Sequence, residues 1–292
     1  MFPGRIRFNQ KMDQYTTFRV GGKAEVICFP HELMPLRQMI LYSYKENIPY
    51  LIIGKGSNIL VKDSGIKGVV IILRGELAAV GRDLHNDEVL LAGGGLTIGD
   101  LLSHCGLEGL TGLEFLAGVP GTVGGAVFMN AGAFGKEIGS KVHEIEIITA
   151  QGELNLMTRS QLKFTYRESS IPRGTVIYRV KFKLSKEQKE KITGRIADYL
   201  KRRKETQPLD YPSGGSTFRN PPMDYAGRLI ENAGLKGTKR GKAMISPKHA
   251  NFIVNTGGAK AEDILALMDL TRKKVREKTG IELEPEIKVV GE

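Results

Sequence analysis

A serine set among glycines is the first feature that could do chemistry. The segment GGSTFRNPP at 214–222 places Ser216 directly behind Gly214 and Gly215. Glycines beside a serine let a ligand approach the backbone closely. Ser216 is therefore a candidate nucleophile, phosphate ligand, proton donor or member of a flexible turn. A nucleophile is disfavoured, because the G-x-S-x-G pattern of a nucleophile elbow is absent around it.

A glycine-rich loop, GKGSN at 54–58, follows a short apolar stretch. Successive backbone N–H groups, a serine hydroxyl and a lysine suit a pyrophosphate. The Walker pattern is missing, which disfavours a P-loop nucleotide triphosphatase. The Rossmann pattern G-x-G-x-x-G is also absent, because Ile59 stands where its last glycine would be needed. Taken alone, this loop is either a tight turn or a ligand site.

A second glycine cluster lies in the otherwise apolar segment 112–135. Small residues in an apolar setting let a flat ring or a diphosphate lie against the backbone. The alternative is close packing of strands around a glycine-rich bend. Because the two clusters are about sixty residues apart, we expect one extended dinucleotide, held at both ends.

The elements that must position these loops alternate between strands and helices. Hydrophobic spacing predicts strands over 24–30, 49–52, 68–73, 88–94, 142–150, 175–184, 251–256 and 283–291. It predicts helices over 31–46, 96–107, 186–204, 223–231 and 260–279. Thr97 and Ser185 are the expected helix N-caps, and Gly280 is the expected stop of the last helix. We divide the chain near residue 185 into a larger α+β region and a smaller α/β lobe.

Composition restricts the class of protein. The net charge of +11 attracts anions, but the basic run KRRK at 201–204 has no interleaved aromatic residues for stacking on bases. Nucleic acid is therefore a weak candidate partner. Cys28 and Cys105 have no metal-site spacing, which argues against zinc or a disulfide framework. No signal core and no run of eighteen apolar residues is present, so we expect a soluble cytoplasmic protein without a membrane partner.

Six motifs occur together in one order along the chain. They are TTFRVGGKAE (16–25), GKGSNILV (54–61), EFLAGVPGTVGGAVFMNAGAFG (114–135), FTYRES (164–169), GGSTFRNP (214–221) and LEPEIKVVGE (283–292). Together they closely resemble the UDP-N-acetylenolpyruvoylglucosamine reductase (MurB) family, from about residue 14 onward. The resemblance is to the shorter type of this family, because the strand at 175–184 leaves no room for a tyrosine-bearing insertion.

The resemblance implies an α+β fold: an FAD-binding fold of the vanillyl-alcohol-oxidase (PCMH-type) group, plus a smaller α/β substrate-binding domain. The implied domains are 1–185 for FAD (subdomains about 1–65 and 66–185), 186–281 for substrate, and a C-terminal strand at 282–292. FAD is expected to bind non-covalently, because no histidine lies in an attachment motif. The implied FAD contacts are Gly54, Lys55, Gly56, Ser57, Asn58, Gly118, Val119, Pro120, Gly121, Thr122, Gly124, Gly125 and Ala126.

The resemblance also implies a reaction. NADPH reduces FAD, and flavin N5 then delivers hydride to UDP-N-acetylglucosamine enolpyruvate, which gives UDP-N-acetylmuramate for peptidoglycan synthesis. By match to the family motifs, Arg167 and Glu286 stabilise the enolate and Ser216 donates the proton. Tyr166 and Asn220 match substrate-binding positions, and Arg219 is a diphosphate partner on charge grounds. We expect a monomer with no metal.

Two other readings of the sequence stay open at this point. One is an FAD oxidoreductase of the same fold that acts on a different alcohol or sugar. The other is a non-enzymatic binder of anions or nucleic acid, driven by the charge of +11. The binder predicts a colourless protein with strongly salt-dependent nucleic-acid binding.

Overall fold

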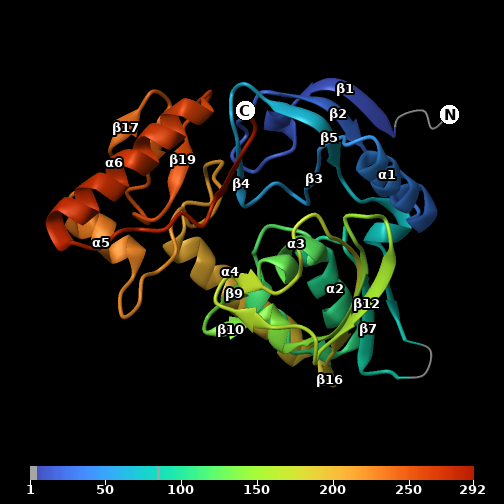
Figure 1. Ribbon diagram of the computed structural model, residues 1–292. Coiled ribbons are helices and arrows are strands. Elements are labelled where there is room, and N and C mark those ends of the chain that lie inside the picture. Colours follow the sequence, from blue (N-terminus) through green and yellow to red (C-terminus); the bar gives the residue numbers. More distant parts are fainter. Residues whose placement is uncertain (1–4, 84–85) are drawn as a thin grey trace. The chain divides into compact units, whose positions relative to one another are not determined.

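The computed structural model describes residues 5–83 and 86–292, which form two units (Figure 1). Within the described residues, the first unit consists of residues 5–7, Val26–Lys55 and Gly68–Arg202. The second consists of Phe8–Glu25, Gly56–Lys67 and Arg203–Glu292. Both units are therefore discontinuous in sequence.

The core of the first unit is a five-stranded antiparallel sheet in the order β12-β11-β15-β7-β6. Its strands are β12 (Leu154–Thr158), β11 (Val142–Ile148), β15 (Val176–Lys183), β7 (Val89–Gly93) and β6 (Val80–Arg82). Helices α2 (Ile98–Glu108) and α3 (Val123–Phe128) pack against this sheet (Figure 1). Buried side chains of β7, β11 and β15 form one cluster with both helices. The predicted strands 88–94, 142–150 and 175–184 are confirmed.

A four-stranded sheet has the order β1-β2-β5-β3. Its strands are β1 (Ile6–Lys11), β2 (Lys23–Cys28), β5 (Ile66–Ile71) and β3 (Tyr50–Ile52). The predicted strand–helix–strand opening is present as β2, α1 (Leu33–Lys45) and β3, with β5 placed between the two strands. Leu36 and Ile40 of α1 are fully buried, because their spacing places them on one face of the helix.

Short elements connect the longer ones in the first unit. The short strand pairs are β8 (Leu110–Thr111) with β16 (Ser185–Lys186), β9 (Gly132–Ala133) with β10 (Lys136–Glu137), and β13 (Phe164–Thr165) with β14 (Glu168–Ser169). There are also 3-10 turns at Gly75–Ala78, Glu114–Leu116 and Ile138–Ser140. Helix α4 (Lys189–Thr206) follows β16.

The second unit contains a three-stranded sheet in the order β17-β18-β19. The strands of this sheet are β17 (Lys239–Arg240), β18 (Ala243–Ile245) and β19 (Ile253–Asn255). The unit also contains helices α5 (Ala226–Asn232) and α6 (Ala261–Thr279), the parallel pair β4 (Ile59–Val61) and β20 (Lys288–Val290), and the 3-10 turn Met12–Gln14. Ile264, Leu267 and Val275 of α6 are buried in one cluster with Phe18 and Phe218. Helix α6 stops at Gly280, as predicted, with a φ of 73°.

Four expectations can be compared with the structure. Thr97 caps α2 as predicted, accepting from the backbone N–H of Asp100 at 3.1 Å. Ser185 is not a helix N-cap: it pairs with Thr111 in β16, and α4 begins only at Lys189. The helical spacing of Ile192, Ile196 and Leu200 indicates one apolar face, but Leu200 is 45% exposed. The bounds of the two units also differ from the expected domain bounds, because residues 8–25 and 56–67 group with the later part of the chain. The functional domains 1–185, 186–281 and 282–292 stay a prediction.

Candidate active site

The two glycine clusters meet within the first unit. A Cβ added to Gly54 would lie 2.3 Å from Oγ1 of Thr122. The residue before the loop is fixed, since the Ile53 N–H donates to the Ile71 carbonyl at 3.0 Å. Gly54 is therefore a glycine because another loop occupies the place of its side chain. Lys55, which follows it, is exposed.

The second cluster is a turn that leads into α3. Gly118 has a φ of 73°, in the left-handed region that favours glycine. The Val123 and Gly124 N–H groups donate to the carbonyls of Leu96 and Gly94 at 2.8 Å each. These bonds fasten the turn to the segment between β7 and α2. Of the predicted contacts here, Gly118, Pro120 and Gly125 are exposed, Val119 and Gly121 are half-buried, and Thr122, Gly124 and Ala126 are buried.

Two adjacent glycines of α3 have different surroundings. A Cβ on Gly124 would lie 3.1 Å from the carbonyl oxygens of Gly94 and Ile177, so close packing on the sheet explains this glycine. A Cβ on Gly125 would meet only Oγ1 of Thr122, at 3.6 Å. The chain's own packing therefore gives no reason for glycine at 125. An exposed backbone surface without a side chain fits a flat ligand, such as a flavin nucleotide.

A hairpin presents Tyr166 and Arg167 as its two loop residues. Its strands pair Thr165 with Glu168, and Arg167 has a φ of 60°. The guanidinium lies 5.1 Å from the centre of the Tyr166 ring, and a Cβ on Gly132 would lie 3.2 Å from Nη1 of Arg167. A Cβ at Gly132 would lie closer still to the Lys136 carbonyl oxygen, at 2.6 Å, so the β9–β10 pair requires this glycine, which also leaves room for the arginine side chain.

Asn130, which the sequence did not single out, fastens this hairpin to the glycine cluster. Its side chain is fully buried. Nδ2 donates to Oε2 of Glu137 at 2.7 Å and to the carbonyl of Thr165 at 2.8 Å, while Oδ1 accepts from the Gly139 N–H at 3.1 Å. Every polar atom of the amide is used. Asn130 follows Met129, the C-cap of α3, so the residues after the glycine cluster also position the Arg167 hairpin.

In the second unit, the end of the first glycine loop is held between two segments. Gly56 has a φ of 60°, and a Cβ there would lie 2.2 Å from the Tyr15 carbonyl oxygen. Asn58 donates from Nδ2 to the Glu286 carbonyl at 3.2 Å and accepts from the Lys288 N–H at 3.0 Å. Ser57, between them, is half-buried. The structure thus brings the predicted residue Asn58 to the predicted residue Glu286.

The serine turn pairs with the segment before β20. Phe218 forms an antiparallel bridge with Pro285. The Glu286 N–H donates to the Thr217 carbonyl and the Arg219 N–H donates to the Glu284 carbonyl, both at 2.9 Å. Ser216 and Glu286 therefore lie on neighbouring stretches of backbone.

The pairing also distinguishes among three glutamates that alternate in the sequence. Glu282, Glu284 and Glu286 would lie on one face of a regular strand, but β20 begins only at Lys288. Glu282 instead forms an ion pair with Arg272 at 2.7 Å. Glu286 is the glutamate that pairs with the residue next to Ser216.

The glycines before the serine have separate structural reasons. A Cβ on Gly214 would lie 2.2 Å from the ring of Phe18, so packing within the protein accounts for it. Gly215 has a φ of 76° and open space around its Cα. After the turn, Asn251 holds Phe218 with both ends of its amide: the Phe218 N–H donates to Oδ1 at 3.0 Å, and Nδ2 donates to the Phe218 carbonyl at 2.8 Å. Asn220 accepts at Oδ1 from the Ala226 N–H at 3.0 Å, at the start of α5.

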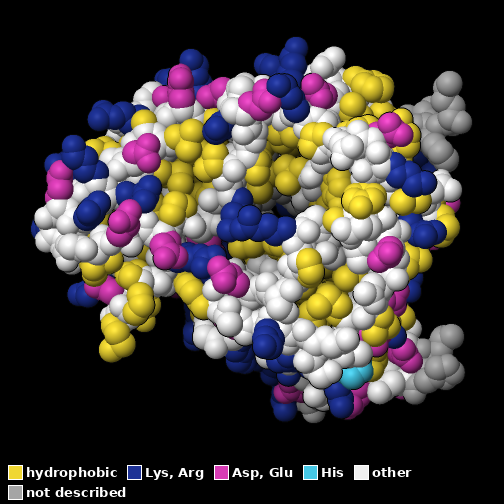
Figure 2. All heavy atoms as spheres, viewed as in Figure 1, with side chains coloured by type: hydrophobic (Ala, Val, Ile, Leu, Met, Phe, Trp, Pro, Cys, Tyr) yellow, Lys and Arg dark blue, Asp and Glu magenta, His cyan; other side chains and the backbone are white. Residues whose placement is uncertain are grey.

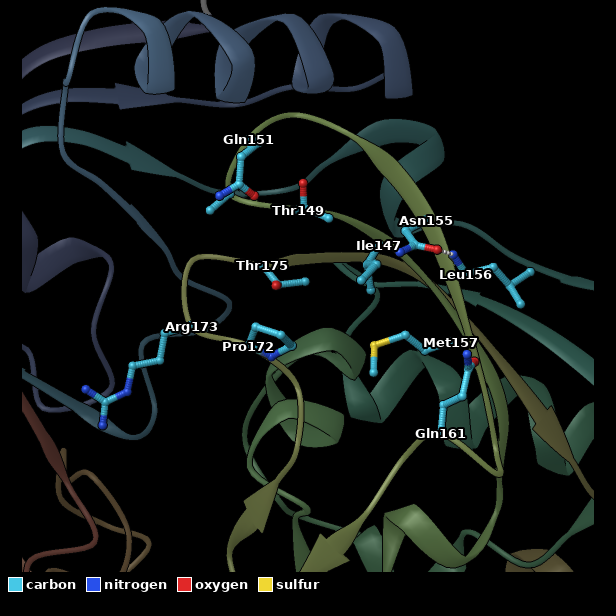
Figure 3. A pocket seen from close by; sticks show the side chains of 11 residues that line it. Ile147, Thr149, Gln151, Asn155, Leu156, Met157, Gln161, Pro172, Arg173 and Thr175 are labelled. Carbon is cyan, nitrogen blue, oxygen red and sulfur yellow. Dashed lines mark hydrogen bonds between the residues drawn. The ribbon is translucent and has the colours of Figure 1, made fainter.

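A cavity of about 390 Å³ lies elsewhere in the first unit, beside the β11–β12 hairpin (Figure 3). Ile147, Met157 and Pro172 give it an apolar wall, and Gln151 and Gln161 add amides at its rim. Figure 3 shows the Arg173 side chain extending away from the other lining residues. None of the predicted site residues lines this cavity.

The surface charges can be compared with the expectation about nucleic acid, and the helices with the expectation about membranes. On the face shown in Figure 2, Lys and Arg side chains are interspersed with Asp and Glu. This mixture of charges differs from the continuous basic groove with aromatic stacking platforms that single-strand binders use. Within residues 5–83 and 86–292, no helix combines the length and apolar character needed to span a membrane.

Comparison with known proteins gives the class of the fold. Residues 24–157 match the family model of an FAD-binding domain, and residues 207–290 match that of the UDP-N-acetylenolpyruvoylglucosamine reductase C-terminal domain. The fold is therefore α+β, with an FAD-binding fold of the vanillyl-alcohol-oxidase (PCMH-type) group, and the chain is a flavin-dependent oxidoreductase.

Full-length relatives define the family. UDP-N-acetylenolpyruvoylglucosamine reductase of Caldanaerobacter subterraneus is 40% identical over 290 residues, covering 99% of this chain and 95% of its own. That of Syntrophus aciditrophicus is 41% identical over 290 residues, covering 99% and 93%. The crystal structure of the reductase (MurB) from Thermus caldophilus has a TM-score of 0.84 and 38% identity, covering 98% of this chain and all of its own. The chain belongs to the UDP-N-acetylenolpyruvoylglucosamine reductase family.

Proposed function

We propose that this reductase converts UDP-N-acetylglucosamine enolpyruvate to UDP-N-acetylmuramate with NADPH, as a step of peptidoglycan precursor synthesis in the cytoplasm. Membership of the UDP-N-acetylenolpyruvoylglucosamine reductase family supports this assignment of the substrate. The observation that carries the catalytic assignment is the backbone pairing between the Ser216 turn and the segment of Glu286. This pairing places the backbones of Ser216 and Glu286 on neighbouring segments, although the two residues are distant in the sequence.

FAD is proposed to lie against the two glycine clusters, held without a covalent bond. Gly54 to Asn58 would hold the diphosphate, and Gly118 to Ala126 the flavin and the rest of the diphosphate. The contact between Gly54 and Thr122 and the open Cα face of Gly125 support this placement. Bound FAD supplies hydride from N5 after reduction by NADPH.

Arg167 is proposed to bind the substrate carboxylate. Charge that develops on the carbon next to the attacked carbon spreads into this carboxylate. A planar guanidinium can donate two parallel hydrogen bonds to a carboxylate, which fixes its orientation as well as its charge. Asn130 and Gly132 hold the hairpin and leave room for the side chain.

Ser216 is proposed to give its hydroxyl proton to the substrate carbon next to the carboxylate. A serine is a weak acid, but a carbanion is a strong base, so the transfer is favourable. Glu286 is proposed to assist Arg167 in stabilising the enolate. An acid beside a substrate carboxylate must be protonated or paired with a cation, because two carboxylates at close range repel each other.

Tyr166, Arg219 and Asn220 are proposed to contact the sugar nucleotide. Arg219 follows the serine turn directly, and its backbone is fixed by the Glu284 carbonyl. The hydrogen bond to the Ala226 N–H holds the Asn220 side chain at the start of α5. All three residues therefore have defined positions before a ligand binds.

The test is an anaerobic assay of the purified protein with NADPH and the enolpyruvyl nucleotide, followed at 340 nm. We expect a yellow protein that releases FAD on denaturation and consumes NADPH beyond the amount that reduces its bound FAD only when the enolpyruvyl nucleotide is present. A yellow protein without substrate-dependent loss of NADPH would exclude this substrate and favour another alcohol or sugar. A colourless protein that FAD does not restore would exclude the flavin site. Sedimentation velocity tests the proposed monomer.

A further inference from the structure

Thr17 connects two of the motifs to which the proposed function assigns separate roles. Its backbone N–H donates to the carbonyl of Gly56, in the first glycine loop, at 3.2 Å. Its hydroxyl donates to the carbonyl of Ser213, three residues before Ser216, at 2.6 Å. The same hydroxyl lies 3.5 Å from the Gly56 carbonyl oxygen. One residue thus holds a carbonyl from each motif, and all of these residues belong to the second unit.

The segment around Thr17 is rigidly placed. Thr16 and Phe18, on either side, are buried. The Thr16 hydroxyl donates to the Val20 carbonyl at 2.9 Å, and Nδ2 of Asn255 donates to the Phe18 carbonyl at 3.0 Å. The Phe18 ring fills the space in front of Gly214. Thr17 therefore offers its hydroxyl from a fixed position.

The serine turn has an anchor on each side of Ser216. On the C-terminal side, the Thr217 N–H donates to the Asn251 carbonyl at 2.8 Å. On the N-terminal side, the Asn255 N–H donates to the Pro212 carbonyl at 2.9 Å, and Ser213 forms a β-bridge with Val254. The Thr17 hydroxyl is the side-chain group that holds the Ser213 carbonyl. Between Ser213 and Ser216 lies Gly215, with a φ of 76° and open space around it. Because glycine allows many backbone conformations, the N-terminal anchor limits where the Ser216 hydroxyl can lie.

We propose that Thr17 is a positioning residue that ties the flavin-diphosphate loop to the proton-donating serine. This inference rests on the proposed role of Ser216. A diphosphate bound at residues 56–58 would fix Gly56, and through Thr17 the same contact would hold Ser213. Thr17 would then affect proton donation to substrate but not the reduction of flavin by NADPH.

The test compares three variants in the two half-reactions by stopped flow. Thr17→Val has nearly the shape of threonine without the hydroxyl, Thr17→Ser keeps the hydroxyl, and Ser216→Ala removes the proposed donor. We expect T17V to keep its FAD content and its rate of reduction by NADPH, and to slow flavin reoxidation by the enolpyruvyl nucleotide about tenfold, the loss expected for one hydrogen bond. T17S should restore the reoxidation rate. Should T17V fail to fold, Thr17→Ala takes its place.

Hydrogen exchange gives a readout that does not depend on turnover. T17V should exchange faster than wild type in a peptide covering residues 209–218, whereas T17S should match wild type. Unchanged exchange and reoxidation in T17V would overturn the inference, as would equal losses in both half-reactions or a T17S variant as slow as T17V. If S216A reoxidises at the wild-type rate, the role of Ser216 fails instead, and the exchange comparison still tests the Thr17 anchor.

Discussion

The backbone N–H of Glu286 donates a hydrogen bond of 2.9 Å to the carbonyl of Thr217. This single bond joins two segments that are about seventy residues apart in the sequence. It places the proposed proton donor, Ser216, on the stretch of backbone next to the proposed glutamate. A pairing between two extended segments is stiffer than a contact between loops, so both functional groups start from defined backbone positions.

Replacing Ser216 with alanine should separate the two half-reactions. Reduction of FAD by NADPH is expected to stay close to the wild-type rate, because no proton from Ser216 is needed there. Reoxidation by the enolpyruvyl nucleotide should fall by roughly 10²- to 10⁴-fold, the usual contribution of a positioned proton donor. Stopped-flow absorbance of the flavin measures both rates. Equal losses in both steps would mean that Ser216 is structural or binds both ligands.

Glu286→Gln tests which of the alternating glutamates acts in the site. The substitution keeps the shape and the backbone pairing, and it should lower kcat for the enolpyruvyl nucleotide by about 10²-fold, as removal of one electrostatic partner does. Glu282→Gln is the matched control. Glu282 forms an exposed ion pair with Arg272, so its loss should cost no more than about 1 kcal/mol of stability and leave kcat unchanged. A larger kinetic effect for E282Q than for E286Q would reverse the assignment.

Arg167→Lys keeps a positive charge but removes the planar fork. The proposed carboxylate contact needs two parallel donors, so kcat/KM should fall by about 10²- to 10³-fold, as it does for loss of one stabilising donor. Arg173→Lys, at an exposed arginine outside the proposed site, is the control. Normal steady-state kinetics in R167K would show that charge alone is sufficient at this position.

Alanine at the two adjacent glycines of α3 should have opposite effects. Gly124→Ala places a methyl group 3.1 Å from two carbonyl oxygens, and we expect it to destabilise the fold by about 1–3 kcal/mol. Gly125→Ala meets no such obstacle and removes a helix glycine, so the apoprotein should gain roughly 0.5–1 kcal/mol. FAD affinity of G125A should nevertheless fall by about tenfold or more, a loss of about 1.4 kcal/mol. Thermal unfolding and flavin fluorescence titration of the apoproteins measure both effects, and normal FAD affinity in G125A would place the ligand elsewhere.

His249 makes stability depend on pH near neutrality. Burial lowers the pKa of its ring below the ordinary value of 6.5, and the charge of Lys236 lowers it further. Its Nδ1 accepts a hydrogen bond from the Asn251 N–H at 3.3 Å, which requires an unprotonated nitrogen. The unfolded chain therefore binds this proton more readily than the folded chain, and stability present above pH 6.5 is lost as the pH falls toward the lower folded-state pKa.

The measurement for His249 is Tm against pH from 7.5 to 5. Asparagine also offers an acceptor oxygen but does not titrate, so His249→Asn should show a shallower fall in Tm than wild type. His143 is exposed, and His143→Asn should keep the wild-type slope. An H249N curve parallel to that of wild type would assign the acid sensitivity to other groups.

The sequence predicted local features well and long-range contacts poorly. The alternation of β11 and β15, the Thr97 cap and the Gly280 stop depend on neighbours within a few residues, and these predictions are confirmed. Ser185 failed as a helix cap because its partner, Thr111, is far away in the sequence and pulls it into a strand. The same limit explains why Asn130 and Thr17 were missed as anchors. Each acts through the backbone carbonyl of a distant segment, and residue types along the sequence do not predict where such a carbonyl will lie.

The sequence located the loops of the candidate site but not the long-range contacts that hold them. Spacing of glycines located both loops, but only the structure shows that Thr122 and Phe18 occupy the places of side chains at Gly54 and Gly214. The alternation of the glutamates at 282, 284 and 286 did not identify the one that belongs to the candidate site. That identification depends on the backbone pairing with the segment 217–219. The catalytic roles came from the family resemblance and stay predictions.

The parallel pairing of β20 with β4 sets the order in which the chain can fold during synthesis. Ile59 leaves the ribosome early, whereas its partner, Lys288, is made more than two hundred residues later. Until residues 261–279 are made, Phe18 and Leu60 also lack the α6 side chains of their core cluster. The nascent chain therefore carries an unpaired strand and exposed apolar residues through most of translation, a state prone to aggregation. Any chain that stops before residue 288 leaves the second unit open, so incomplete products should be substrates for chaperones and proteases.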